Sequence, residues 1–228
     1  NAASVTMETT TSNYVAIKNQ EIITLSRIPV LSYGKFYGEV VELMKQPAMH
    51  CVNYYAYWNG DILKFICCLA DDQAKDIKVL SHEMPKKEKM QLTSITREVY
   101  ALHIFEREIS ENFGIEFIYS PWSKPVRYAF NRADQKKVIN SYPFYKIQSD
   151  ELHEVGVGPI HAGVIEPGHF RFLCNGETVL HLEIQLGWQH RGVEDLFLKK
   201  SHLLQRTILS ESIAGDTAIG HSTAFVSL

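Results

Sequence analysis

The sequence contains neither a long apolar run nor an excess of charge of one sign. Its longest purely apolar run spans Phe65 to Ala70, whereas a helix needs roughly 20 apolar residues to cross a bilayer, and the polar N-terminus lacks the apolar stretch of a signal peptide. A formal net charge of -3 provides no basic surface for nucleic acid or for an anionic membrane. We therefore expect a cytoplasmic chain with no nucleic-acid partner.

Metal-binding cysteine pairs and phosphate-binding glycine loops are also missing. The four cysteines, at positions 51, 67, 68 and 174, show no Cys-x-x-Cys spacing, so we expect small buried side chains in a reducing compartment. No Walker or GxGxxG segment occurs, so direct nucleotide binding is not expected. The 228 residues, 45% of them hydrophobic, suffice for one large or two small cores. Residues 1–4 look like a tag remnant and carry no fold information.

The first half of the chain shows one helical pattern followed by strand patterns. Apolar residues recur at helical spacing across Ser32 to Lys45, and Pro47 closes the segment. Met49 to Ala70 is rich in β-branched and aromatic residues and is interrupted at Asn59-Gly60, the strongest short signal for a hairpin. A further strand is expected across Ile77 to Met84.

A long helix is expected from Thr96 to Phe113, ended by Gly114. It carries the run Glu106-Arg107-Glu108-Ile109-Ser110-Glu111-Asn112-Phe113-Gly114-Ile115. On its own, such a charged run is typical of a solvated helix face. The run nevertheless resembles the Glu-Arg-Glu-x-x-Asp-x-Phe-Gly-Ile signature of the C subunit of respiratory complex I, with Glu111 in the place of the Asp.

The segment from Ser120 to Glu154 is aperiodic and contains several prolines, so we expect a linker there. Beyond it, His169 to Cys174 and Thr178 to Leu186 flank Asn175-Gly176, which predicts a hairpin with a type I′ turn. The second strand alternates apolar with polar residues, so its apolar face should be buried and its polar face wet. The apolar positions are Leu180, Leu182, Ile184 and Leu186, and the polar ones are His181, Glu183 and Gln185.

Four motifs follow one another between Val155 and Phe225. They read Gly158-Pro159-Ile160-His161, Glu166-Pro167-Gly168-His169-Phe170-Arg171, Gly187-Trp188-Gln189-His190-Arg191-Gly192-Val193-Glu194 and Gly220-His221-Ser222-Thr223-Ala224-Phe225. In this order they resemble the start of the large subunit of membrane-bound nickel-iron hydrogenases and the homologous D subunit of complex I. A C-like part followed by a D-like part in one chain is similar to the large subunit of formate hydrogenlyase and its relatives.

The resemblance implies an α+β fold in three stretches. A C-subunit-like α/β domain would occupy residues 14–120 and a linker residues 121–154. Residues 155–228 would form the β-hairpin and helical start of a hydrogenase-large-subunit-like domain. From Gly192 onward the pattern is helical, with Ser201 as the candidate N-cap.

Side chains that the two resembled families have at three positions are absent here. In the hydrogenases a Cys-x-x-Cys pair just before the last motif supplies thiolates to the nickel-iron centre, and here the matching positions hold Ala214 and Thr217. Soft sulfur donors are required there, so we expect this chain to bind no metal. In complex I a tyrosine after the first lost cysteine donates to the quinone carbonyl. Gly215 stands in its place and has no side chain with which to donate.

By resemblance, Glu194 belongs to a proton path, with His190 and Arg191 beside it. A carboxylate suits this task because burial can raise its pKa toward neutrality. The alternatives are an acid at a helix start, stabilised by the helix dipole, and a structural ion pair for Arg191.

The resemblance also places His161, Gly215 and His221 in the wall of the cavity. A histidine taken singly is more often a core or surface residue than a ligand. A zinc site built from His153, His161, His169 and His181 is conceivable, but the spacings match neither HExxH nor any zinc finger.

Taken together, the motifs imply a subunit of a membrane-associated, energy-converting oxidoreductase complex of the hydrogenase or NADH:quinone dehydrogenase type. Its partners would be an iron–sulfur small subunit, membrane subunits and the remainder of the large subunit, on the cytoplasmic side of the inner membrane. The family complexes use nickel-iron and iron–sulfur centres, with NAD or quinone in the complex I relatives. Two rival interpretations stay open: a non-catalytic scaffold that has lost the metal site, and an independent small-molecule or zinc enzyme.

The last segment, Thr217 to Leu228, is apolar and has no C-terminal Gly, Pro or basic cap. We expect a helix that belongs to a larger bundle, and hence the front portion of a longer protein. An apolar helix without its bundle should cause self-association through residues 217–228.

Overall fold

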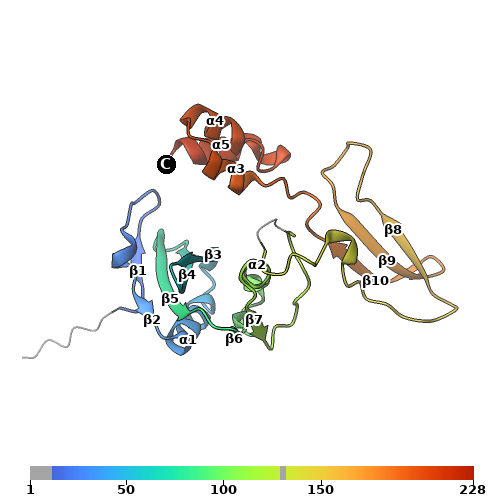
Figure 1. Cartoon of the computed structure of the whole chain (residues 1–228), viewed down its shortest axis with the longest axis horizontal. Helices are drawn as coiled ribbons and strands as arrows, with labels where there is room; N and C mark the ends of the chain where they lie inside the picture. Colours follow the sequence, from blue (N-terminus) through green and yellow to red (C-terminus); the bar gives the residue numbers. More distant parts are fainter. Residues whose placement is uncertain (1–11, 129–131) are drawn as a thin grey trace, which may run out of the picture. The chain divides into compact units, whose positions relative to one another are not determined.

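The computed structural model describes residues 12–128 and 132–228, so the expected tag remnant at residues 1–4 lies outside the described chain. The chain divides into two compact units (Figure 1). The first holds the chain up to Glu106 together with Phe117–Pro121, and the second holds Arg107–Glu116 and Trp122–Leu228. The division therefore passes through one helix, which supplies residues to both units.

The first unit is built on a five-stranded sheet. Its strands are β1 (Val15–Ile17), β2 (Val30–Leu31), β3 (Met49–Asn59), β4 (Ile62–Asp71) and β5 (Asp76–Pro85). The order is β1-β5-β4-β3, with β2 running parallel to β5. The β3–β4 hairpin and strand β5 confirm the expected strands, and Gly60 makes the hairpin turn at a φ of 60°. Strands β1 and β2 were not predicted, because two or three residues give no periodicity.

Helix α1 (Tyr33–Met44) confirms the predicted helix and covers one face of this sheet. Phe36 and Val40 are fully buried, and the Phe36 ring lies 5.8 Å from Tyr54 and 6.2 Å from His82. A second cluster, centred on Ile28 and Ile66, also contains residues of β1 and β5. The central strand β4 is therefore covered on both sides, which explains its nearly continuous apolar run.

The helix that was expected to begin at Thr96 begins later. Short 3-10 turns η2 (Ile95–Arg97) and η3 (Tyr100–Leu102) precede helix α2 (His103–Phe113), and β6 (Gln91–Thr93) pairs with β7 (Glu116–Ile118) on either side. The prediction was wrong here because the backbone amides of η2 bond to a side chain of α2 instead of continuing into that helix. Gly114, with a φ of 73°, ends α2 as expected.

The second unit contains a three-stranded antiparallel sheet. Its strands are β8 (His153–Val157), β9 (His169–Asn175) and β10 (Thr178–Gln185), in the order β10-β9-β8. The predicted hairpin is confirmed, but β8 was missed. The turn is not of type I′, since that type needs two positive φ angles and only Gly176, at 55°, has one.

The faces of this sheet are inverted relative to the prediction. Leu182 and Ile184 are 46% and 40% exposed, whereas Glu183 and Gln185 are 6% and 3% exposed. The polar face is covered by part of the expected linker (121–154), and we call its described residues 122–128 and 132–152 the strap. Gln185 donates to the Ile139 carbonyl of the strap at 2.6 Å, and Glu183 accepts from the amide of Tyr145 at 2.8 Å. Alternation thus located the strand but not the face that would be covered.

Three helices end the second unit: α3 (Val193–Lys199), α4 (Leu203–Ser210) and α5 (Ala218–Val226), with the 3-10 turn η5 (Gly215–Thr217) before the last. The Phe197 and Phe225 rings pack at 5.5 Å. His202, not the expected Ser201, is the N-cap of α4, and it makes no side-chain capping bond. Of the helices that the structure describes, none has the length and apolarity needed to cross a membrane.

Candidate functional site

The charged run on α2 is not a solvated face. Glu106 is 1% exposed, and its carboxylate accepts hydrogen bonds from the Ser94 hydroxyl at 2.5 Å, the Ile95 amide at 2.7 Å and the Thr96 hydroxyl at 2.7 Å. Burial raises the pKa of Glu106, and these donors only partly oppose that effect. Glu106 therefore holds the turn η2 in place within the first unit.

The next residue, Arg107, anchors the strap. Its guanidinium donates to the carbonyls of Lys124 at 2.7 Å and Pro125 at 3.1 Å and lies 4.9 Å from the centre of the Trp122 ring. Arg107 is 5% exposed, and these carbonyl dipoles and the aromatic face help to stabilise its buried charge.

One turn later, Glu111 fixes the backbone of the strap. Its carboxylate accepts hydrogen bonds from three successive amides: Val126 at 3.1 Å, Arg127 at 3.0 Å, and Tyr128. A carboxylate that receives several amide donors is a strong, charge-assisted contact. The three bonds set the position from which the Arg127 side chain extends.

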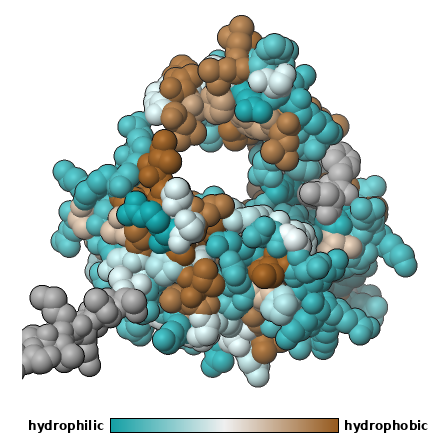
Figure 2. Space-filling view, turned by 60° about the vertical axis from the view of Figure 1, so that its left-hand side comes forward, coloured by the Kyte–Doolittle hydropathy of each residue, from teal (hydrophilic) through white to brown (hydrophobic). Residues whose placement is uncertain are grey.

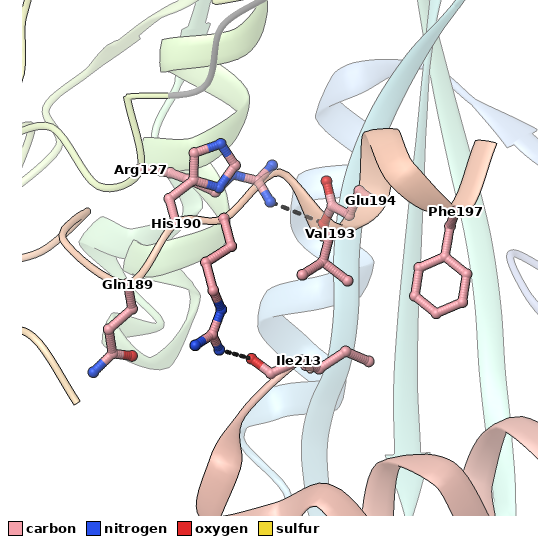
Figure 3. Close-up of a pocket in the computed structure, with 8 residues that line it drawn as sticks. Arg127, Gln189, His190, Val193, Glu194, Phe197 and Ile213 are labelled. Carbon is pink, nitrogen blue, oxygen red and sulfur yellow. Dashed lines mark hydrogen bonds and ion pairs between the residues drawn. The ribbon is translucent and has the colours of Figure 1, made fainter. Parts of the chain in front are cut away.

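Arg127 joins two carboxylates from different helices. It donates to Glu194 on α3 at 2.8 Å (Figure 3). It also forms a second ion pair with Glu108 on α2. Burial acts to lower the pKa of Arg127, but the bond to Glu194 and the charge of Glu108 outweigh it and raise the pKa. For Glu108, burial raises the pKa despite the adjacent arginine. Arg127 and Glu194 line a pocket of about 240 Å³. Its other lining residues are Gln189, His190, Arg191, Val193, Phe197 and Ile213.

His190 and Glu194, which the sequence predicts for a proton path, share this pocket. The Glu194 side chain is 75% exposed and stands in the first turn of α3, which also fits the alternative of an acid at a helix start. Burial lowers the pKa of His190, and the charge of Arg127 lowers it further. The shift favours the neutral ring, in which one nitrogen can accept a proton.

The Arg191 side chain pairs with a different carboxylate, that of Glu166. It lies 3.3 Å from the Glu166 carboxylate and donates to the Ile213 carbonyl at 3.2 Å. The same Glu166 oxygen accepts from the Gly215 amide at 3.2 Å. One carboxylate therefore ties the loop before β9 to Arg191 and to the start of η5, beside the positions where the two thiolates were expected and not found.

The loop from Gly158 to Gly168 is braced by two histidines. His161 bonds to the Gly168 carbonyl at 2.7 Å, and His169 to the Gly158 carbonyl at 3.2 Å. A side chain at Gly158, where φ is 88°, would come within 2.1 Å of the Gly168 oxygen. His161 thus has a structural role in closing this loop, while His221 lies half-buried on α5.

A larger pocket of about 650 Å³ lies next to these groups. Its wall includes Phe170, Ile184 and Trp188, and its polar members include Arg127, Glu166 and His190. An apolar wall with a few polar groups suits a small organic molecule better than a bare ion. The structure brings Gly215 and Arg191 together through Glu166, whereas His161 is not among the residues that line either pocket.

Sequence reasoning missed Arg127 and Glu166. Glu166 stood within a quoted motif, but nothing in the motif indicated its partners. Arg127 lies in the expected linker, where the sequence offers no motif around it. The only available signal was its positive charge, which could pair with one of the acidic residues on α2. Long-range pairing of this kind is not visible in local periodicity.

The residues at the expected metal position do not fit a nickel-iron centre. Ala214 and Thr217 carry no thiolate, and soft sulfur ligands are needed to hold and bridge these metals. Across residues 12–128 and 132–228, no group of three or more His, Cys, Asp or Glu side chains is arranged to hold a metal ion.

Comparison with known proteins confirms the predicted resemblance. Hydrogenase-4 component G of Escherichia coli (strain K12) is 33% identical over 85 residues, which are 37% of this chain and 15% of that protein. Formate hydrogenlyase subunit 5 of the same strain is 34% identical over 86 residues, also 37% of this chain and 15% of that protein. The chain thus spans less than a sixth of the length of these two relatives. No protein-family model matches it.

A third relative covers more of the chain. The C/D subunit of the NADH-quinone oxidoreductase of Phocaeicola vulgatus is 22% identical over 169 residues, which cover 61% of this chain and 33% of that protein. This share is more than residues 121–228 alone can supply, so the similarity extends into the residues before position 121.

Proposed function

We propose that this chain, whose relatives are hydrogenase and NADH-quinone oxidoreductase subunits, is part of a membrane-associated, energy-converting oxidoreductase complex in which electron transfer is coupled to proton movement. The observation that carries the proposal is the order of its parts. A C-like motif on α2 precedes four D-like motifs, and a C/D protein is similar over 61% of the chain.

Within that complex, Glu194 with His190 and Arg191 would form a proton path, and His161, Gly215 and His221 would line the adjoining cavity. The shared pocket of Glu194 and His190 supports the first assignment. Arg191 would act from a fixed position, because Glu166 and a backbone carbonyl already hold it. No step is assigned to nickel or iron, since the residues at positions 214 and 217 cannot hold them.

A second candidate function is a non-catalytic scaffold. The Glu166 carboxylate favours it, because this side chain bonds to Arg191 and to the Gly215 amide beside the lost thiolate positions. A site that once depended on a metal for its shape would be closed by such a contact. The chain would then keep the docking surface of the family without its redox chemistry.

The partners implied by the proposal are an iron–sulfur subunit, membrane subunits and further parts of the large subunit, with the complex peripheral on the cytoplasmic side of the inner membrane. The second unit displays apolar residues that a partner could cover: Figure 2 shows them gathered on α3–α5. Ile219, Val226 and Leu228 are 83%, 63% and 94% exposed. Without its partners, the chain should self-associate through residues 217–228.

The test is to isolate the native complex through a tag on this chain and to measure redox turnover with hydrogen, formate and NADH as donors. An iron–sulfur subunit that co-purifies, with donor-dependent turnover abolished by Glu194→Gln, is the expected result. An intact complex without any turnover would support the scaffold. Recovery of the chain without redox subunits would overturn both.

A further inference from the structure

We infer that Arg127 is a positioning residue for Glu194: the strap carries this cation to α3 and holds the carboxylate at the pocket beside His190. The inference deepens the proposed function, because it rests on Glu194 as the working carboxylate. It concerns a residue outside all of the motifs, in a segment expected to be a mere linker.

The first support is that the backbone of Arg127 is fixed from α2. Glu111 accepts the amides of Val126, Arg127 and Tyr128, and Arg107 takes the two preceding carbonyls. Tyr128 has a left-handed φ of 55°, a conformation that a non-glycine residue keeps only when its surroundings enforce it. Five consecutive residues of the strap are thus defined by one helix.

The second support is the geometry of the guanidinium. One terminal nitrogen donates to Glu194 and the other pairs with Glu108, so the fork spans two carboxylates on two helices. The Arg127 side chain is 22% exposed, against 75% for Glu194. Arg127 is therefore the anchored member of the pair and Glu194 the member that it holds. A lysine, with a single ammonium, cannot occupy both positions at once.

The third support is electrostatic. After burial, the charge of Arg127 is the largest influence that lowers the pKa of His190, whereas Glu194 acts in the opposite direction. The arginine thus orients one candidate proton carrier and favours the neutral form of the other. The pKa of His190 therefore indicates whether Arg127 remains beside it.

The experiment is an NMR titration of His190 in the 228-residue chain. We expect Arg127→Gln to move the His190 midpoint up by about half a pH unit or more, because a nearby positive charge is lost, and Arg127→Lys to restore it only in part. Lys199→Gln is the matched control, since Lys199 pairs with Asp195 on the same helix α3; it should leave the midpoint unchanged. An unchanged midpoint in Arg127→Gln, or an equal shift in the control, would overturn the inference.

If Arg127→Gln fails to fold, Glu194→Gln tests the same contact from the exposed side. This substitution removes a negative charge beside His190, so the titration midpoint of His190 should move down. An unchanged midpoint would show that Glu194 is not held beside His190. Turnover of the native complex separates this inference from the proposed function. Full turnover in Glu194→Gln, with the His190 shifts present, would refute the proton role and leave the positioning role standing.

Discussion

At the scale of single residues, the charged run on α2 shows how one motif can serve several contacts. Glu106 faces the turn η2, Arg107 and Glu111 hold the strap, and Glu108 pairs with Arg127. The run therefore combines buried and half-buried acids and bases that each have a defined partner. A sequence match alone could not distinguish this arrangement from an exposed helix face.

Replacing Glu106 with Gln should lower the free energy of unfolding by about 1–3 kcal/mol, because one amide oxygen cannot serve all the donors that face the carboxylate. Burial raises the pKa of Glu106 above 4.5, so the folded form binds the proton more tightly than the unfolded form. The contribution of this carboxyl group to the free energy of unfolding is therefore greatest below about pH 4.5. It declines as the pH rises through the pKa that Glu106 has in the folded protein.

Urea unfolding of both proteins at several pH values is the measurement. The difference in the free energy of unfolding between wild type and Glu106→Gln should be largest at the lowest pH and should become smaller toward neutral pH. Glu42→Gln, on the exposed side of α1, should change stability by less than about 0.5 kcal/mol. A difference that widens toward neutral pH would contradict the expected direction.

At the scale of elements, the strap determines which face of the second unit's sheet is covered. Period-two alternation found β9 and β10 but assigned the wrong face to the interior, because the cover is an irregular segment with no pattern of its own. Helix α1 and the β3–β4 hairpin were predictable, since their apolar spacing and turn residues are local signals. The start of α2 was not predictable, because the Glu106 side chain, ten and eleven residues further on, accepts hydrogen bonds from the amides of Thr96 and Ile95.

Limited proteolysis should cut first between residues 120 and 154, the aperiodic segment, and not within α2. Glu183→Gln should increase the rate of these cuts about five-fold or more, because Glu183 is the partner of both Lys124 and the Tyr145 amide, and a lost buried acceptor weakens the local structure. Mass spectrometry of the first fragments gives the cut sites. Glu177→Gln, in the exposed β9–β10 turn, is the control and should cut at the wild-type rate.

At the scale of the whole molecule, uncovered apolar surface determines how the isolated chain behaves. The exposed side chains of α5 should associate, since burial is worth about 25 cal/mol per Å² of apolar area. Sedimentation of the full chain should show oligomers that disappear when residues after Asp216 are removed. A monodisperse monomer in both forms, with α5 ordered in the full chain, would contradict this expectation.

The purified chain should contain neither nickel nor iron in stoichiometric amount and should evolve no hydrogen, because Ala214 and Thr217 supply no thiolates. Elemental analysis of protein prepared in nickel-supplemented medium is the measurement. Introducing Ala214→Cys and Thr217→Cys together tests whether the loop still has the shape of a metal site. Stoichiometric nickel in the unmodified chain would show that other residues supply the ligands.

Helix α2 belongs to both compact units, which limits how the gene for such a protein can be divided. A break at Pro121, the last residue of the first unit, would place the strap on one polypeptide and its anchors Arg107 and Glu111 on the other. Neither product alone could then hold the backbone of residues 124–128 in its observed position. The two polypeptides would have to be synthesised in equal amounts and associate. Production as a single polypeptide removes that requirement for matched synthesis.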